Sequence, residues 1–152
     1  MNQGIIRIWI GRWDFDPWRT TFYPNGLSTA KQLRYAAERL TSLEINANYY
    51  HSQKPATFAA WSKAVPDGFK FSVKTSRFTT NRKVLADGTE SVERFHTQGI
   101  VELGERNGPS LWQFGTTKQF DPDDFVGFLA TLPVALNDAQ WRVAAARSRH
   151  TP

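Results

Sequence analysis

The stretch FKFSVK, residues 69–74, decides the fold, because apolar and polar side chains alternate along it without a break. Alternation with a period of two is typical of a β-strand that has one apolar and one polar face. The turn signal Pro66-Asp67-Gly68 lies directly before it, and a polar stretch runs from Arg77 to Gly88 after it. We therefore predict a strand over residues 69–74, entered from a turn and followed by a polar loop.

Two more strand-and-helix units precede this strand. Isoleucines at every second position predict a strand over residues 4–10, and a short strand is expected over residues 43–46. Ser28 or Thr29 can cap a helix after the first strand, and Pro55 suits the first turn of a helix after the second. The apolar positions of these two helices are Ala30, Leu33, Ala37 and Leu40 in the first and Phe58 and Trp61 in the second.

A further unit and a last helix follow. The next helix has a shared apolar face formed by Val92, Phe95, Ile100 and Leu103. Gly104 and Gly108-Pro109 end this helix, and a fourth strand is expected over residues 110–114. Asp121 can cap the last helix, with Pro122 as its first residue. The buried stripe expected on that helix is Phe125, Phe128, Leu129 and Leu132.

Strands that alternate with helices predict βαβ units and a parallel sheet. The nucleotide-binding pattern G-x-G-x-x-G does not follow the first strand, and G-x-x-x-x-G-K-[ST] does not occur. Polar residues at alternate strand positions suit a barrel lumen, because a sheet covered on both faces has more continuously apolar strands. We predict an α/β protein of about four βα units whose parallel sheet curls towards a barrel.

Composition excludes several classes of site. The 152 residues fit one domain, and the absence of cysteine excludes disulfides and thiolate metal sites. Three scattered histidines do not suggest a metal site within this chain, and no cofactor follows from the sequence. No run of about 18 apolar residues occurs, and the N-terminus lacks the regions of a signal peptide. A cytoplasmic protein without a membrane partner is therefore expected.

The net charge of +5 favours contact with polyanions. Much of this charge comes from Arg142, Arg147 and Arg149, which stand in the last eleven positions of the chain. Without these three arginines the net charge falls from +5 to +2. The basic character therefore belongs largely to the tail.

Several segments together resemble the YecE-like family, domain of unknown function 72. The matching segments, in chain order, are IGRW (10–13), Trp18, FYP (22–24), EIN (44–46), YY (49–50), Trp61, PDGFKF (66–71), VK (73–74) and GPSLWQF (108–114). The resemblance runs from about Ile5 to Leu132 and implies a TIM-type barrel of uncharacterised function. The family often has a histidine in the loop after the third strand, where Asn81 stands after Thr80.

The resemblance stops near Pro133, whereas family members continue through a barrel of about 250 residues. We expect residues 1–133 to form the N-terminal half of such a barrel and residues 134–152 to be an atypical tail. The Ala/Arg-rich ending from Trp141 to Pro152 suggests a frameshift or truncation within the fifth unit. The alternative is a short amphipathic helix over residues 141–149.

Period-two geometry assigns the strand residues to two faces. The residues expected to face the helices are Leu43, Ile45, Phe71 and Val73. The residues expected to face the lumen are Glu44, Asn46, Ser72 and Lys74. TIM barrels carry their active sites at the C-terminal ends of the strands. Arg12 and Trp13 after the first strand and Gln113 on the fourth therefore join a predicted polar cluster at one mouth.

Glu44 and Lys74 are the candidate catalytic residues. They are expected on adjacent strands, where they can pair. Glu44 is suited to act as a general acid or base, and Lys74 to hold an anionic group of the substrate. The equal alternative is a structural ion pair in the barrel interior.

The remaining candidates are predicted to bind substrate. Asn46 can orient a substrate or satisfy the neighbouring glutamate. Arg77 and Asn81 on the loop after the third strand can contact phosphate, although a solvated surface is the alternative for an arginine there. Trp13 and Tyr50 can stack bases or sugar rings, or pack the loops over the mouth. No histidine or acidic spacing predicts a metal site in this segment.

Three functions are consistent with this sequence. The first is a hydrolase-type enzyme that acts on a phosphorylated or nucleic-acid-like substrate at the C-terminal mouth. The second is a non-catalytic nucleic-acid-binding module. The third is a truncated fragment with no function of its own, in which exposed sheet edges favour self-association, including a homodimer of half-barrels.

Overall fold

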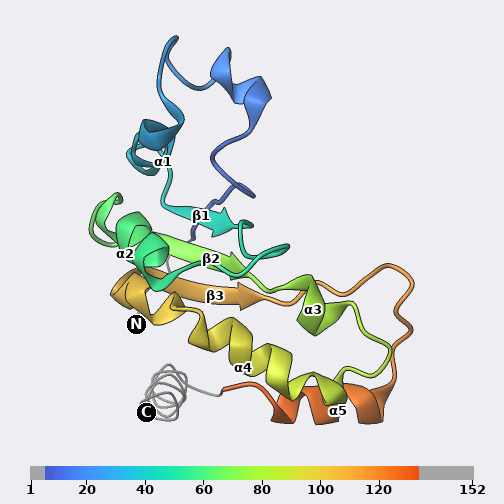
Figure 1. The fold of residues 1–152 in the computed structure, drawn as a ribbon. Helices are drawn as coiled ribbons and strands as arrows, with labels where there is room; N and C mark the ends of the chain where they lie inside the picture. Colours follow the sequence, from blue (N-terminus) through green and yellow to red (C-terminus); the bar gives the residue numbers. More distant parts are fainter. Residues whose placement is uncertain (1–5, 134–152) are drawn as a thin grey trace.

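The computed structural model describes residues 6–133 (Figure 1). The strands are β1 (Ser42–Ile45), β2 (Lys70–Lys74) and β3 (Asn107–Leu111). The α-helices are α1 (Thr29–Ala37), α2 (Pro55–Lys63), α3 (Arg77–Thr80), α4 (Thr89–Thr97) and α5 (Pro122–Ala130). The 3-10 helices are η1 (Asp16–Arg19), η2 (Ala86–Gly88) and η3 (Ile100–Arg106). The predictions for the tail lie outside the described residues.

The three strands form one parallel sheet in the order β1-β2-β3, with all arrows pointing the same way (Figure 1). In the register of β1 and β2, Leu43 is paired with Phe71 and Ile45 with Val73. All four side chains are fully buried, in a core that includes residues of α1, α2, α4 and η3. The predicted apolar face is therefore confirmed as the centre of the core.

The strand expected over residues 4–10 is not formed in the part of it that the structure describes. Residues 6–10 lie beside β1, where Glu44 N donates to Ile10 O at 2.9 Å and Ser42 Oγ donates to Ile8 O at 3.0 Å. The alternating isoleucines do not bury a face, because Ile6 is 90% exposed and Ile8 is 72% exposed. The described sheet therefore has three strands, and the prediction of four was wrong.

β3 begins three residues earlier than predicted, because Gly108 permits a close approach to β2. A Cβ atom at Gly108 would lie 2.6 Å from Phe71 O, a contact that no other residue type would permit without movement. The register also shifts between Phe71 and Val73, which pair with Asn107 and Ser110. This bulge accommodates Pro109, which has no backbone N–H to donate to the ladder.

The helix predicted across residues 92–103 is divided by a left-handed glycine. α4 ends at Thr97, Gly99 has φ 116°, and η3 begins at Ile100. The four apolar residues predicted for this face are nevertheless all buried. The polar stretch over residues 77–88 was predicted as a loop, but it contains α3 and η2. The Ser76 hydroxyl accepts a hydrogen bond from Phe78 N and so starts α3.

The other predicted helices are confirmed, with corrections at single residues. Pro55 stands in the first turn of α2, while Ser28 occupies the cap position of α1 without a side-chain hydrogen bond. Asp121 caps α5 as predicted, since its Oδ1 accepts from Asp123 N at 3.0 Å and Asp124 N at 3.1 Å. The stripe of α5 is narrower than predicted. Phe128 is buried with Leu85 and Val92, but Leu129 is 48% exposed.

A half-buried ion pair between Lys118 and Asp124, with its hydrogen bonds to residues 83 and 86, holds the loop before α5 against the segment before α4. Asp124 Oδ2 accepts from Lys118 Nζ at 2.8 Å, and Asp124 Oδ1 accepts from Ala86 N at 2.9 Å. Lys118 Nζ also donates to Lys83 O at 2.6 Å. The Leu85 amide, the Lys118 ammonium and the Ala86 amide lower the pKa of Asp124 from 3.8 to about 2.

We predict that Gly99→Ala destabilises the protein more than Gly68→Ala. Both glycines have positive φ, which costs an L-residue about 1–2 kcal/mol. Only at Gly99 would the new Cβ also meet Pro55 Cα, at 2.5 Å, whereas Gly68 has open space. Such overpacking adds about 1–3 kcal/mol. Urea unfolding of the two variants measures the difference, and equal losses would contradict this account of the α2–η3 contact.

We further predict that Asp124→Asn weakens the protein at neutral pH but not at very low pH. Because the pKa of Asp124 is lower in the folded state, its contribution to stability is present above about pH 4 and is lost as the pH falls towards 2. Urea unfolding at several pH values measures the difference in the free energy of unfolding between wild type and variant. This difference should disappear as the pH falls. Asp123→Asn serves as the control, because the neighbouring Asp123 is exposed. The free energy of unfolding of this variant should not show the same dependence on pH. A difference for Asp124→Asn that does not depend on pH would contradict the account.

Candidate functional site

The C-terminal ends of β1 and β2 bring together most of the predicted site residues. The register pairs Glu44 with Ser72, so both lie on the same face of the sheet. Asn46 follows β1 directly, and Lys74 is the last residue of β2. Figure 1 shows α3 beyond the arrowheads of the sheet, at this same end. The loop after β1 and the turn into α3 therefore share one edge.

Glu44 is a buried carboxylate that lies close to Asn46 and Gly11. Its side chain belongs to a residue that is only 7% exposed, and within residues 6–133 it has no hydrogen bond or ion pair. A Cβ atom at Gly11 would lie 3.8 Å from Glu44 Oε1 and 3.5 Å from Asn46 Nδ2. Asn46 Nδ2 donates to Gly11 O at 2.7 Å, while its own Oδ1 is buried without a partner among the described residues. Glu44 and Asn46 therefore converge beside Gly11.

The predicted pairing of Glu44 with Lys74 does not form. No ion pair joins the two side chains in the described chain, and Lys74 Nζ instead lies 5.0 Å from the centroid of the Tyr49 ring. The register explains this, because it places Glu44 opposite Ser72, two residues before Lys74. A carboxylate and a cation on one face are thus not paired with each other.

Asn48, which the sequence analysis missed, fixes the loop after β1 against the end of β2. Its side chain is 1% exposed, and its Nδ2 donates to Lys74 O. Arg77 N also donates to Tyr49 O, at 3.1 Å. These bonds hold the two tyrosines over the start of α3. The only sequence signal for Asn48 is a short polar residue directly before two aromatic ones.

Arg77 lies against exposed aromatic rings. Its guanidinium carbon is 5.3 Å from the centroid of Tyr50 and 5.3 Å from that of Phe78. Tyr49 and Tyr50 contact each other edge to face, with centroids 4.8 Å apart. Tyr50 is 55% exposed and Phe78 is 60% exposed. Cations and ring faces are thus presented together to solvent, an arrangement that can bind an anionic group and stack an aromatic one.

Arg12 and Trp13 do not take part in this arrangement. The Arg12 side chain pairs with Asp14 at 3.3 Å, and its backbone has φ 129°, a rare value for a residue other than glycine. Trp13 packs edge to face on Trp61, with centroids 5.4 Å apart. Its carbonyl accepts from the Tyr23 hydroxyl, whose pKa burial and, to a lesser extent, Asp14 raise to about 12. Trp13 is therefore anchored to the core cluster.

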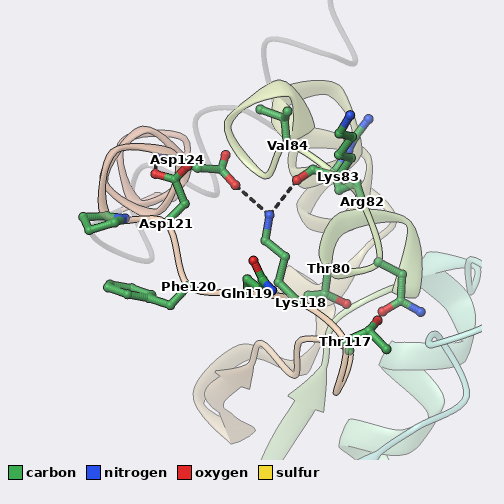
Figure 2. Close-up of a pocket in the computed structure, with 13 residues that line it drawn as sticks. Thr80, Arg82, Lys83, Val84, Thr117, Lys118, Gln119, Phe120, Asp121 and Asp124 are labelled. Atoms are coloured by element: carbon green, nitrogen blue, oxygen red, sulfur yellow. Dashed lines mark hydrogen bonds and ion pairs between the residues drawn. The ribbon is translucent and has the colours of Figure 1, made fainter.

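Asn81 and Gln113 lie elsewhere along the same edge. Asn81 ends α3 and borders an open groove of about 1090 Å³, which lies between residues 80–84 and 115–122 (Figure 2). Figure 2 shows the Lys118 side chain reaching across this groove to Asp124 and the Lys83 carbonyl. Gln113 is exposed beyond the end of β3. Sequence reasoning missed the groove, because its two walls are far apart in the chain.

Within residues 6–133, no cluster of three or more histidine or acidic side chains could hold a metal ion. In that range no helix combines the length and apolar character that a membrane crossing requires.

The fold of this chain is similar to that of a solved DUF72 protein. Two crystal structures of a DUF72 family protein from Enterococcus faecalis V583 match this chain, each at 21% identity. The 3.10 Å structure has a TM-score of 0.65 and covers 83% of this chain and 46% of its own. The 2.52 Å structure has a TM-score of 0.53 and covers 68% of this chain and 43% of its own. This chain therefore spans less than half the length of these structures.

A comparison with curated proteins finds no match. The family model described as "Protein of unknown function DUF72" matches residues 7–147. The match continues beyond Pro133, where the resemblance read from the sequence ends. It covers most of the chain, and the YecE-like resemblance is consistent with it. The chain belongs to the DUF72 family.

Proposed function

We propose that this chain binds a phosphorylated or nucleic-acid-like ligand at the C-terminal ends of β1 and β2, and that it acts there as a hydrolase with Glu44 as general acid or base. The observation that carries the proposal is the placement of Lys74 and Arg77. Both cations lie against tyrosine rings, and neither pairs with a carboxylate in the described chain.

The absence of such pairing separates these two residues from most other arginines of the described chain. Arg12, Arg19, Arg34, Arg39, Arg94 and Arg106 each pair with an acidic side chain. An ion pair already neutralises those charges, whereas Lys74 and Arg77 retain theirs for a ligand. Phosphate is a suitable ligand, because arginine binds it through two parallel hydrogen bonds and lysine through its point charge.

Glu44 supplies the group that a hydrolysis reaction needs. It is buried on the same face as Lys74, and its side chain has no hydrogen-bond or ion-pair partner within the described residues. A carboxyl group so placed can take a proton from water or give one to a leaving group. The Asn46 Oδ1 atom, also without a described partner, can orient the attacking water.

We also infer that the sheet is part of a TIM-type barrel in the complete fold. The support is its parallel strand order, together with its likeness to the longer solved DUF72 structures. In such barrels the C-terminal ends of the strands form the active-site face. The proposed site lies at those ends.

A second candidate is binding without catalysis. It is favoured by the exposure of Tyr50 and Phe78, both of which lie near the Arg77 guanidinium, because stacked bases need free ring faces. In this case Glu44 would contribute only to the architecture of the site. The two candidates therefore differ in what happens when the carboxylate alone is removed.

We predict that Arg77→Gln and Glu44→Gln separate binding from chemistry. Arg77→Gln should weaken adenosine monophosphate binding, measured by calorimetry, by about tenfold or more, because a charge-assisted hydrogen bond is lost. Glu44→Gln should leave that affinity nearly unchanged but lower the turnover of bis-(para-nitrophenyl) phosphate by about 10²–10⁴-fold.

Lys63→Gln is the matched control for charge. Lys63 is exposed at the end of α2, before the turn that enters β2, and so lies at the opposite edge of the sheet. The Lys63→Gln variant should bind adenosine monophosphate and hydrolyse bis-(para-nitrophenyl) phosphate as the wild type does. Binding that responds equally to Arg77→Gln and Lys63→Gln would contradict the proposed site. Ligand binding without any turnover in the wild type would favour the second candidate.

A further inference from the structure

We propose that the ligand is a single-stranded nucleic acid of several nucleotides, which runs from the Arg77–Tyr50 pair past α3 into the groove between residues 80–84 and 115–122. This inference rests on the proposed function and names its substrate class. It is carried by three features of the groove: its continuity with the first site, its unpaired charge, and its exposed ring.

The groove continues the proposed site without a gap in the chain. Arg77 opens α3 and Thr80 closes it, so one helical turn, about 5 Å along the axis, separates the two places. Asn81 N donates to Arg77 O at 2.8 Å, which fixes the start of the groove relative to the guanidinium. With a volume of about 1090 Å³ the groove has room for more than a phosphate group.

The cations of this track outnumber its carboxylates, which are Asp121 and Asp124 on the second wall of the groove. Residues 74–86 contain no Asp or Glu. Their basic residues are Lys74, Arg77, Arg82 and Lys83, and none of them pairs with a carboxylate within residues 6–133. On the groove wall, Arg82 donates to Ser91 Oγ at 3.3 Å, while the Lys83 ammonium has no described partner. Lys83 is therefore the cation that can take up a second phosphate.

Lys118 has a different part in the groove. Its ammonium is bound by Asp124 and by the Lys83 carbonyl, so its charge is already neutralised. Figure 2 shows that its side chain spans the groove between the two walls. It therefore sets the width of the groove and the position of Lys83 without contacting phosphate itself.

Three exposed rings accompany the cations along the track. Tyr50 and Phe78 flank Arg77, and Phe120 lines the groove with 74% of its surface exposed. Stacking on successive rings, interleaved with cations, is how proteins hold single strands of about 4 to 16 nucleotides. Thr80 adds a polar group at the border, since its buried Oγ1 has no partner among the described residues. A mononucleotide would leave Phe120 and Lys83 unused.

Fluorescence anisotropy on the full 152-residue chain tests this inference. The probes are a labelled mononucleotide and thymidylate and uridylate oligomers of about eight nucleotides. We expect the oligomers to bind at least tenfold more tightly than the mononucleotide, and their relative affinities identify DNA or RNA as the source. A labelled polyglutamate peptide of similar charge should bind far more weakly.

Two variants in the groove test whether the groove is the source of the tighter binding of oligomers relative to the mononucleotide. Phe120→Ala should weaken oligomer binding by about 5- to 100-fold through lost stacking. Lys83→Gln should reduce the slope of log affinity against log salt by about 0.7, the value for one phosphate contact on a single strand. Neither change should affect the mononucleotide. Lys63→Gln and Val126→Ala, both exposed and outside the track, are the controls.

The outcomes distinguish the two proposals. Oligomer binding no tighter than mononucleotide binding, or unaffected by both groove variants, would overturn this inference while the Arg77-dependent site stands. Equal binding of polyglutamate would overturn it as well, in favour of an acidic peptide. If no nucleotide probe depends on Arg77, the proposed function itself fails.

Discussion

The parallel pairing of β1 with β2 is the interaction on which the rest of this structure depends. It places Leu43 beside Phe71 and Ile45 beside Val73, and all four side chains are fully buried. Complete burial makes the register costly to change, because a shift of one residue would turn every apolar side chain to the opposite face. Since the register is fixed, the loop after β1 and the turn after β2 must emerge side by side, and the candidate site lies where they do.

The same pairing explains why a carboxylate and a cation remain unpaired on one face. The register places Glu44 opposite Ser72, while Lys74 extends one step further and lies against Tyr49. The hydrogen bond from Asn48 to Lys74 O then holds the tyrosine loop in place. Burial of the apolar face thus stabilises the sheet, whereas the polar face, which contributes less to folding, carries the proposed site. Unsatisfied polar groups of this kind are expected at sites of function.

The sequence correctly predicted those elements in which the order of apolar and polar residues matches the burial of their side chains, or in which the stabilising contact is local. β2 was placed within one residue, because its alternating side chains are buried and half-exposed in turn. The cap of α5 was also predicted, because Asp121 acts on its own helix. The prediction of a strand over residues 4–10 was wrong, since the alternation of its side chains does not correspond to burial. β3 begins earlier than predicted, because Gly108 approaches β2 closely. The groove could not be predicted, since its walls are more than 30 residues apart in the chain and are joined by tertiary bonds such as that from Lys118 Nζ to Lys83 O.

The central claim is that the C-terminal edge of the sheet, and not another surface, receives the ligand. Amide chemical-shift mapping with the thymidylate oligomer tests it most directly. The account predicts shifts in residues 46–50, 74–83 and 115–120, with little change in α2 or in the turn at residues 66–68. Shifts concentrated at the opposite edge, around Lys63 and residues 104–107, or spread evenly over all basic residues, would contradict it.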